Sequence, residues 1–259
     1  MKKPPAAAVR FPAKVGLDFP VRHGNNVSTT MKKLIPLCVL TVIVAGALPL
    51  RAADQPAKSD GLVPLVLKLP APAFKGTPKD LPEGLVVEPL SDKPRPALMV
   101  PAGCLNLVAG LKPTSSDTNS TPEKLAKLTD GDKEAYETSI VLLRKGVQSV
   151  QFDLGKPAEL QAIVVWHAHD TAKVYRNVVV QIADDAAFAQ NVRTLYNNDT
   201  ENKAGQGVGT DRQYFETNEG RLVPAKGQKA QFVRLWSRGS TESALNEYTE
   251  VEVWGKPAP

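Results

Sequence analysis

The sequence predicts an all-β protein, built as an antiparallel sandwich or barrel, over roughly residues 100–256. Segments in which apolar and polar residues alternate recur along this stretch, with the period expected of strands that turn one face to a core. Polar turn sequences separate these segments, and no long helical pattern lies between them. About 155 residues are enough to build one core, so we expect a single domain here.

Alternation predicts the individual strands, starting with the segment that ends at Gly155. In this segment Val150, Phe152 and Leu154 share one face. A helical turn is expected ahead of it, at 121–128, where Thr121 suits the N-cap and Pro122 the first helical position. A second helical turn is expected at 185–190. The predicted strands cover residues 149–154, 160–167, 177–183, 193–196, 231–237 and 248–255.

Residues 31–53 have the features of a secretory signal peptide. Two lysines follow Met31, an apolar run fills residues 34–50, and the small residues Ala52 and Ala53 precede the expected cleavage. An uncleaved membrane anchor is the alternative, but a span needs roughly 20 apolar residues, and this run is shorter and contains proline and glycine. We therefore expect a secreted protein, periplasmic or extracellular, without lasting insertion in a membrane.

The segments on either side of the signal peptide are interpreted from their composition. Residues 1–30 lack a consistent pattern and precede a good start at Met31, which indicates an over-called N-terminal extension; a long cytoplasmic n-region is the alternative. Residues 54–99 are rich in proline, which removes backbone donors and fixes φ. We expect an extended arm or linker there. It either lies across the domain, for which its apolar pieces argue, or is a disordered spacer.

The formal charge of +5 does not describe the part of the chain expected to be exported. Residues 1–53 hold eight of the 32 basic residues and one of the 27 acidic residues. The remainder has 24 basic and 26 acidic residues, a net charge of −2, so nucleic acid is not an expected partner. Cys38 falls in the signal peptide, which leaves Cys104 without a partner for an internal disulfide.

Seven short motifs follow one another in a recognisable order. They lie at residues 106–113, 128–132, 150–155, 162–166, 178–185, 232–235 and 250–255. Together they resemble the discoidin, or coagulation factor F5/8 type C, domain of the galactose-binding-like superfamily. The resemblance covers roughly residues 100–256 and implies a jelly-roll β-sandwich. Its motifs are specific for the fold and not for a ligand.

The acidic turn Asp130-Gly131-Asp132 is a candidate cation site. Calcium takes six to eight oxygen ligands, which carboxylates and the carbonyls of a tight turn can supply. The resemblance implies a structural calcium between this turn and the last strand, held by Asp130, Asp132, the region of Thr138, and Glu250. The alternative is an Asp-Gly turn that binds no metal.

The loop after the second predicted strand is a candidate ligand site. His167 and His169 lie two residues apart and share a face, so they could ligate a transition metal or bond to sugar hydroxyls. Asp170 and Arg176 complete the predicted ligand-binding set, because planar polar groups suit sugar hydroxyls. The resemblance implies an arginine in this loop, but Ala168 stands near its place. An exposed polar loop without a ligand is therefore the alternative.

The polar stretch 197–219 is long for a loop inside a domain. It is either functional, as a second cation site or a ligand rim, or a solvated hairpin. No serine-nucleophile motif and no phosphate-binding loop occurs in the sequence. These observations predict a non-catalytic module that binds carbohydrate or another cell-surface or matrix ligand. The first alternative is a structural protein that docks on an envelope protein, and the second is a metal-dependent enzyme that uses His167 and His169.

Overall fold

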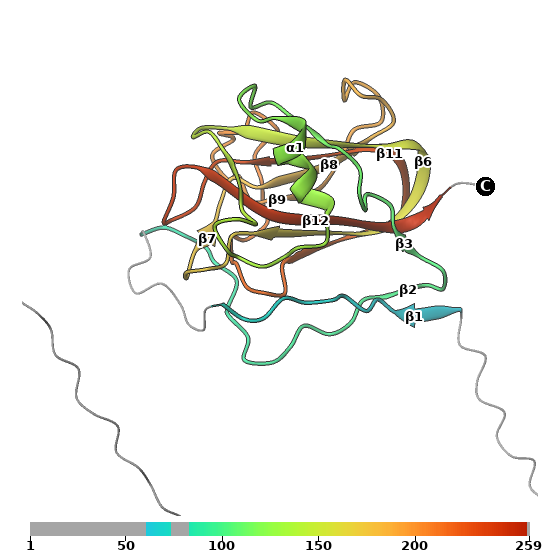
Figure 1. The fold of residues 1–259 in the computed structure, drawn as a ribbon, viewed down its shortest axis with the longest axis horizontal. Coiled ribbons are helices and arrows are strands. Elements are labelled where there is room, and N and C mark those ends of the chain that lie inside the picture. The colour runs from blue at the N-terminus through green and yellow to red at the C-terminus, as the bar shows by residue number, and fades with distance from the viewer. Residues whose placement is uncertain (1–60, 74–82, 258–259) are drawn as a thin grey trace, which may run out of the picture. The chain divides into compact units, whose positions relative to one another are not determined.

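The structure, a computed structural model, describes residues 61–73 and 83–257 (Figure 1). The predicted extension 1–30 and signal peptide 31–53 lie outside the described residues, as do residues 54–60 and 74–82 of the arm. Within the described ranges, no helix is long and apolar enough to cross a membrane.

Most strands belong to one antiparallel sheet with the order β3-β12-β6-β11-β8-β9, in which β4 also pairs with β6 and β5 with β12. Its strands are β3 (Leu105–Asn106), β4 (Thr114–Ser115), β5 (Val141–Leu143), β6 (Gln148–His167), β8 (Val179–Ala183), β9 (Arg193–Asn197), β11 (Arg221–Ser237) and β12 (Asn246–Pro257). Two small antiparallel sheets join β1 (Leu62–Pro64) to β2 (Met99–Pro101) and β7 (Val174–Tyr175) to β10 (Tyr214–Phe215). The predicted all-β antiparallel architecture is confirmed.

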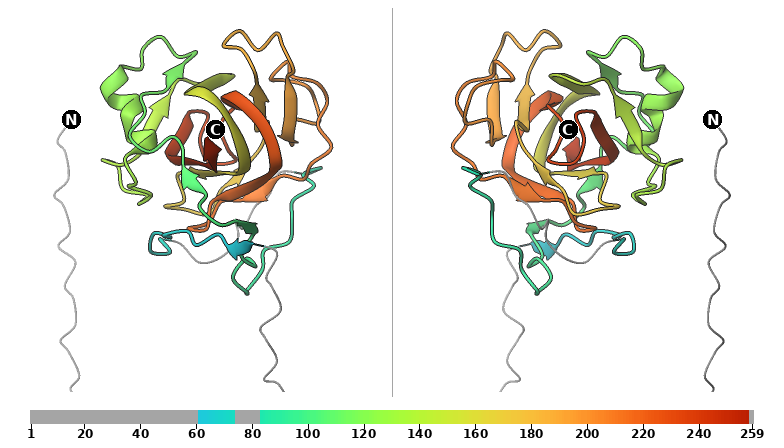
Figure 2. Two further views of the ribbon diagram at one scale, coloured as in Figure 1. Left: turned by 90° about the vertical axis from the view of Figure 1, so that its right-hand side faces the viewer. Right: turned by 90° about the vertical axis from the view of Figure 1, so that its left-hand side faces the viewer.

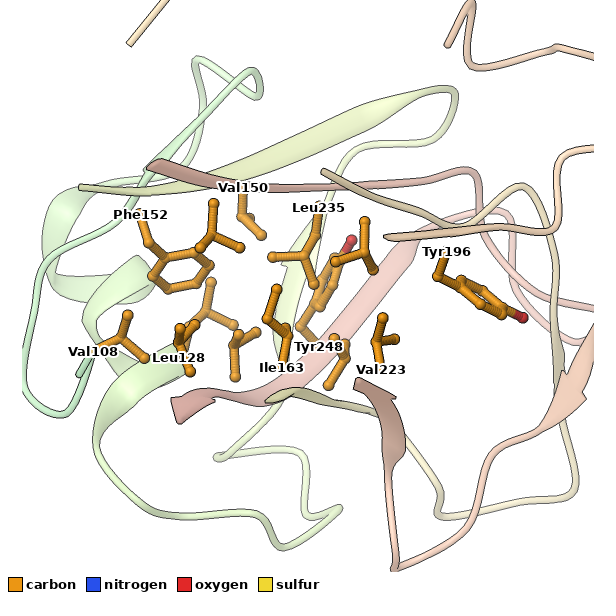
Figure 3. Close-up of a cluster of buried hydrophobic side chains, with 14 of the residues drawn as sticks. Val108, Leu128, Val150, Phe152, Ile163, Tyr196, Val223, Leu235 and Tyr248 are labelled. Carbon is orange, nitrogen blue, oxygen red and sulfur yellow. The ribbon is translucent and has the colours of Figure 1, made fainter. Parts of the chain in front are cut away.

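Two long strands, β6 and β11, bring the sheet around the core. They pair along most of their length, with register shifts after Pro224 and after Ala230. Figure 2 shows both strands curving, so that two layers of the sheet face each other. Val150 and Phe152, from the first part of β6, consequently pack in the same apolar cluster as Ile163 from its second part (Figure 3).

Two strands that the sequence separates are one strand in the structure. Residues 149–154 and 160–167 both belong to β6, which continues through Gly155 and pairs with β11 on one side and β12 on the other. Gly155 has a φ of +75° and lies where the register with β11 shifts, so it bends the strand instead of ending it. Strand β11 follows β6 across this bend, and it therefore begins at Arg221, well before the expected start at residue 231.

The first predicted helical turn is confirmed and the second is wrong. Helix α1 (Pro122–Leu125) is capped by Thr121, whose Oγ1 accepts from the Lys124 N–H at 3.3 Å, and a 3-10 turn, η1 (Ala126–Thr129), follows. Residues 185–190 form no helix. The Asp185 carboxylate accepts from the backbone N–H groups of residues 187, 189 and 190, which gives the backbone an alternative to helical bonds.

The described part of the proline-rich arm packs on the domain through apolar side chains. Leu65 and Val100 are buried together with Ala162 of β6. Leu67 and Trp254 border the same cluster. Figure 1 shows β1 and β2 next to β12, in agreement with these contacts.

Polar contacts hold the arm at a second place. The Arg95 guanidinium donates to the carbonyl oxygens of Gly220 at 2.7 Å and Glu219 at 2.8 Å. Farther along, Arg221 makes an ion pair with Glu88 at 2.6 Å. Of the two alternatives for the arm, the described residues therefore follow the one in which it lies across the domain.

Candidate functional site

The acidic turn lies against the last strand. The Gly131 N–H donates to both carboxylate oxygens of Glu250 in β12, each at 3.2 Å. The two regions meet, as the resemblance implies. Strand β12 lies inside the sheet, between β3 and β6. Burial raises the pKa of the Glu250 carboxyl to about 8; Lys133 and the Gly131 amide oppose this shift, and Glu252 adds to it.

The oxygens expected to bind calcium are engaged by donors of the protein. Asp130 Oδ1 accepts from the Asp132 N–H at 2.9 Å, and Asp132 Oδ2 accepts from the Ser139 hydroxyl at 2.7 Å. The Thr138 carbonyl oxygen accepts from the Lys127 ammonium. Across residues 61–73 and 83–257, no three His, Cys, Asp or Glu side chains group so as to hold a metal ion. The four predicted ligands thus accept hydrogen bonds from the protein as they lie, and calcium binding stays a prediction.

A lysine provides positive charge beside this turn. The Lys133 ammonium lies 2.7 Å from Glu252 Oε1, with both side chains nearly buried, and 5.0 Å from the centroid of the Trp166 ring. Its charge lowers the pKa of Glu250, against the larger effect of burial. The turn and the last strand thus have a protein cation next to their carboxylates.

His167 is a core residue. It is fully buried, and its ring stacks on Tyr175 with 4.2 Å between centroids. Its Nδ1 lies 3.1 Å from Glu216 Oε2 and 3.2 Å from the Tyr214 hydroxyl. Burial lowers the pKa of His167 to about 3 and raises the pKa of Glu216 well above its usual value, and both shifts favour the uncharged side chain. This position does not present His167 to an external ligand.

The other three predicted ligand residues lie apart from His167. His169 is 2% exposed, and its Nε2 lies 3.0 Å from the carbonyl oxygen of Lys133. Asp170 is exposed and accepts from Lys173 at 2.7 Å. The two histidines thus have different partners and form no pair of metal ligands. Of the four residues, Arg176 alone lines the hollow described next.

A hollow of about 720 Å³ opens beside Arg176. Its walls come from three connections, between β5 and β6, after β7, and between β11 and β12. This volume lies within the range of small-molecule sites. The lining residues are Lys145, Gly146, Arg176, Arg238, Ser240, Thr241, Glu242, Ser243 and Ala244.

Asn246 joins two of these connections below the hollow. It is fully buried, and its Nδ2 donates to the carbonyl oxygens of Arg144 at 2.7 Å and Gly146 at 3.0 Å. Its Oδ1 accepts from the Ser237 hydroxyl at 2.7 Å and the Gly239 N–H at 2.9 Å. Because all four bonds lie inside the protein, the two walls are held in a fixed relation before any ligand binds.

The polar stretch 197–219 supports the third wall. Asn198 donates from Nδ2 to the Tyr175 carbonyl oxygen at 3.1 Å and accepts at Oδ1 from the Val178 N–H at 2.7 Å, so it holds the backbone on both sides of Arg176. Asp199 is fully buried and accepts from Asn177 Nδ2 at 2.6 Å. This carboxylate is therefore used inside the fold, which gives the stretch a supporting role.

The sequence indicated one residue of the hollow and missed the others. Arg238 directly follows the predicted strand 231–237, and Lys145 shortly precedes the predicted strand 149–154. Both positions were visible as strand ends. What brings them together is the pairing of Ser237 with Gln148, and this register could not be read from a single sequence.

Comparison with known proteins gives a likeness in fold. No family model matches the chain, and no curated protein matches it either. Solved structures similar to it include CpGH89CBM32-6 produced by Clostridium perfringens, with 16% identity, a TM-score of 0.38, and coverage of 58% of this chain and 99% of the other. The Streptococcus pneumoniae fucose binding module SpX-3 has 16% identity and a TM-score of 0.41, covering 57% and 96%.

A third similar structure is the CBM32 of AlyQ in complex with 4,5-unsaturated mannuronic acid, with 17% identity and a TM-score of 0.39, covering 55% of this chain and 93% of the other. The sheet itself, antiparallel throughout and curved into two facing layers, is the all-β antiparallel architecture that the sequence predicts. At these identities and TM-scores the likenesses carry no argument about the ligand, so the chemistry of the site has to come from the residues of this chain.

Proposed function

We propose that the domain is a non-catalytic carbohydrate-binding module of an exported protein and that its ligand occupies the hollow beside Arg176. The single observation that supports this is the lining of the hollow. Two guanidinium groups, a lysine and several hydroxyls surround a space of about 720 Å³, and together they come from three connections. A few polar groups placed around a preformed space is the usual construction of a site for a small polar ligand.

Hydrogen bonds inside the protein fix the loops that carry the lining groups, and this favours binding. Asn246 ties the Arg144–Gly146 backbone to Gly239, and Asn198 holds the backbone around Arg176. A ligand that enters therefore does not have to order these loops, and less of its binding free energy is lost to ordering.

A glycan array probed with the purified exported part of the chain tests the proposal. We expect binding to a subset of polysaccharides, and we expect Arg176→Ala to lose it while keeping the wild-type melting temperature. Asp170→Ala is the matched control, because Asp170 lies on the other side of β7 and not in the lining. Silence of the wild-type protein on every glycan, or unchanged binding by Arg176→Ala, would contradict the proposal.

A structural role on an envelope protein is the second candidate, and one observation favours it. The arm and its surroundings expose apolar side chains, among them Val66, Met99 and Leu105, of which Val66 is 79% exposed. Single exposed apolar residues are common, whereas several near one another can mark a contact surface. A partner that co-purifies with the wild-type protein and is lost in Val66→Asp, but not in Arg176→Ala, would support this role.

A further inference from the structure

The hollow beside Arg176 is lined by several positively charged side chains, although the domain as a whole has a slightly negative net charge. Lys145, Arg176 and Arg238 come from three different connections, and Glu242 is the one carboxylate in the lining. Residues 54–259 have a net charge of −2, since 24 basic residues face 26 acidic ones. The cluster is therefore a local feature and not a consequence of a basic protein.

The three cations are free of protein partners. Within residues 61–73 and 83–257, none of them makes a salt bridge. Three other arginines of the described chain do make ion pairs, as Arg193 does with Asp184 at 2.9 Å. Cations from separate loops that line one hollow without a counter-ion repel one another. An anion bound between them reduces this electrostatic repulsion.

Arg176 has an additional unpaired donor. Its Nε is buried, and no hydrogen-bond acceptor of the described chain reaches it. Buried Nε atoms of Arg193 and Arg221 also lack a partner, but each of these guanidinium groups has an acidic partner through another nitrogen. A buried N–H without a partner is uncommon, and a guanidinium group matches the two oxygens of a carboxylate or sulfate.

The hydroxyls of the lining also act as donors toward the hollow. Ser240 Oγ accepts from the Glu242 and Ser243 N–H groups, and Thr241 Oγ1 accepts from the Val174 N–H. Each oxygen then retains its own hydrogen to donate. Together with the three cations, these hydroxyls give the lining several donors, which suit a ligand whose recognised groups are negatively charged oxygens.

We propose that the hollow selects acidic sugars, with a carboxylate or sulfate group of a polyanionic polysaccharide bound between Arg176 and Arg238 and steered by Lys145. This inference rests on the proposed carbohydrate-binding function and adds the class of ligand to it. The chemistry it requires is an anionic oxygen pair attached to a sugar ring, which uronic acids and sulfated sugars both provide.

Titration calorimetry of the exported part of the chain, residues 54–259, tests the proposal with three kinds of oligosaccharide of equal length. The first carries uronic acids, the second is the methyl ester of the first, and the third carries sulfate esters. We expect the acidic ligands to bind at least tenfold more tightly than the ester, and this preference to shrink between 50 and 500 mM NaCl because exposed charges are screened. Comparison of the uronate with the sulfate shows which anion is preferred.

Substitutions of the two arginines test where the anionic group of the ligand binds. Arg176→Gln and Arg238→Gln should each weaken binding of the acidic ligand by about tenfold or more, the loss expected for one charge-assisted hydrogen bond. Binding of the ester should change little. Lys229→Gln is the matched control for net charge, because Lys229 is exposed on β11 opposite Glu159, away from the lining. Melting temperatures show that each variant is folded.

The possible outcomes separate the two proposals. If the methyl ester binds as tightly as the acid, the preference for acidic sugars is wrong and the carbohydrate-binding function stands. Acid binding that survives both arginine substitutions places the anion elsewhere and also overturns the inference. If none of the three ligands binds and a glycan array is silent as well, the proposed function itself fails.

Discussion

Asn246 shows how much one buried side chain can determine at the scale of a residue. All four of its hydrogen bonds go to the protein, and they connect the start of β6 with the connection before β12. Asn246→Ala leaves two carbonyl oxygens and one N–H without their partner in a buried place. We expect a loss of about 3 kcal/mol in the free energy of unfolding, measured by urea denaturation.

The same variant separates folding from binding. At a temperature where Asn246→Ala is still folded, its affinity for the ligand of the hollow should fall, since the two walls are no longer fixed. Asn119→Ala is the control, because Asn119 is exposed and only its backbone takes part in a hydrogen bond. A variant as stable as the wild type would show that water replaces the lost amide.

The buried pair His167 and Glu216 predicts a particular dependence of stability on pH. We expect the folded pair to hold one proton, because burial favours neutral His167 and protonated Glu216. Between pH 4.5 and 6.5, the ordinary pKa values of the two groups, the unfolded chain also holds one. The contribution of the pair to the free energy of unfolding therefore does not change with pH in this window. It falls below pH 4.5, where the unfolded chain holds two protons, and above pH 6.5, where it holds none.

Glu216→Gln tests this dependence, because glutamine stays uncharged. Relative to wild type, the variant should gain about 1.4 kcal/mol of unfolding free energy per pH unit above pH 6.5. Its acid decline should begin near pH 6.5, the ordinary pKa of histidine, instead of pH 4.5. Glu137→Gln, at an exposed position, should follow the wild-type curve. Parallel curves for Glu216→Gln and wild type would mean that Glu216 adds no bound proton to the folded protein, and would contradict the prediction.

At the scale of an element, the arm depends on Arg95 for its second attachment. Two carbonyl oxygens accept from this guanidinium group, and the Glu219 carboxylate accepts from the Arg95 N–H at 3.1 Å. In Arg95→Ala we expect hydrogen exchange at the Glu88 N–H, which bonds to the Gln213 carbonyl oxygen at 2.8 Å, to become about tenfold faster. Lys93→Ala, at an exposed neighbour, should leave the exchange rate unchanged. Equal protection in both variants would show that the arm stays in place without Arg95.

The strands show which elements a sequence reveals and which it hides. Alternation found the strands whose one face enters the core, such as the one with Val150 and Phe152. It misread Gly155 as an end, because a glycine at positive φ looks the same in a turn and in a bulge. It also missed pairs as short as β7 and β10, which exist because neighbouring strands are already in place.

At the scale of the whole molecule, the acidic turn bears on whether the fold depends on a cation. The turn and the last strand are joined by the Gly131 N–H, and Lys133 lies beside Glu252. We therefore expect the melting temperature to change by less than about 1 °C when EDTA replaces calcium, since the carboxylates already have partners in the protein. A rise of several degrees with calcium, absent in Glu250→Gln, would instead establish the calcium site that the sequence predicts.

Much of the fold, but little of the candidate site, could be predicted. The alternating segments led to the observed antiparallel β architecture, and the meeting of the turn with Glu250 followed from the resemblance. The set of ligand-binding residues could not be predicted in this way, because it depends on which side chains are exposed. His167 ends a strand that is buried on both faces, whereas Arg176 lies beyond that strand and lines the hollow. Burial of this kind depends on which strands lie next to one another, and sequence periodicity does not report that.

The position of β12 inside the sheet has a consequence for how the protein matures. The strand, Asn246–Pro257, lies between β3 and β6, and every other strand of the sheet precedes it in the sequence. A growing polypeptide in which this strand has not yet been made has an open seam in the middle of its sheet. Completion of the domain must therefore wait for β12, and its pairing with β3 joins residues more than a hundred positions apart, as in slowly folding β proteins.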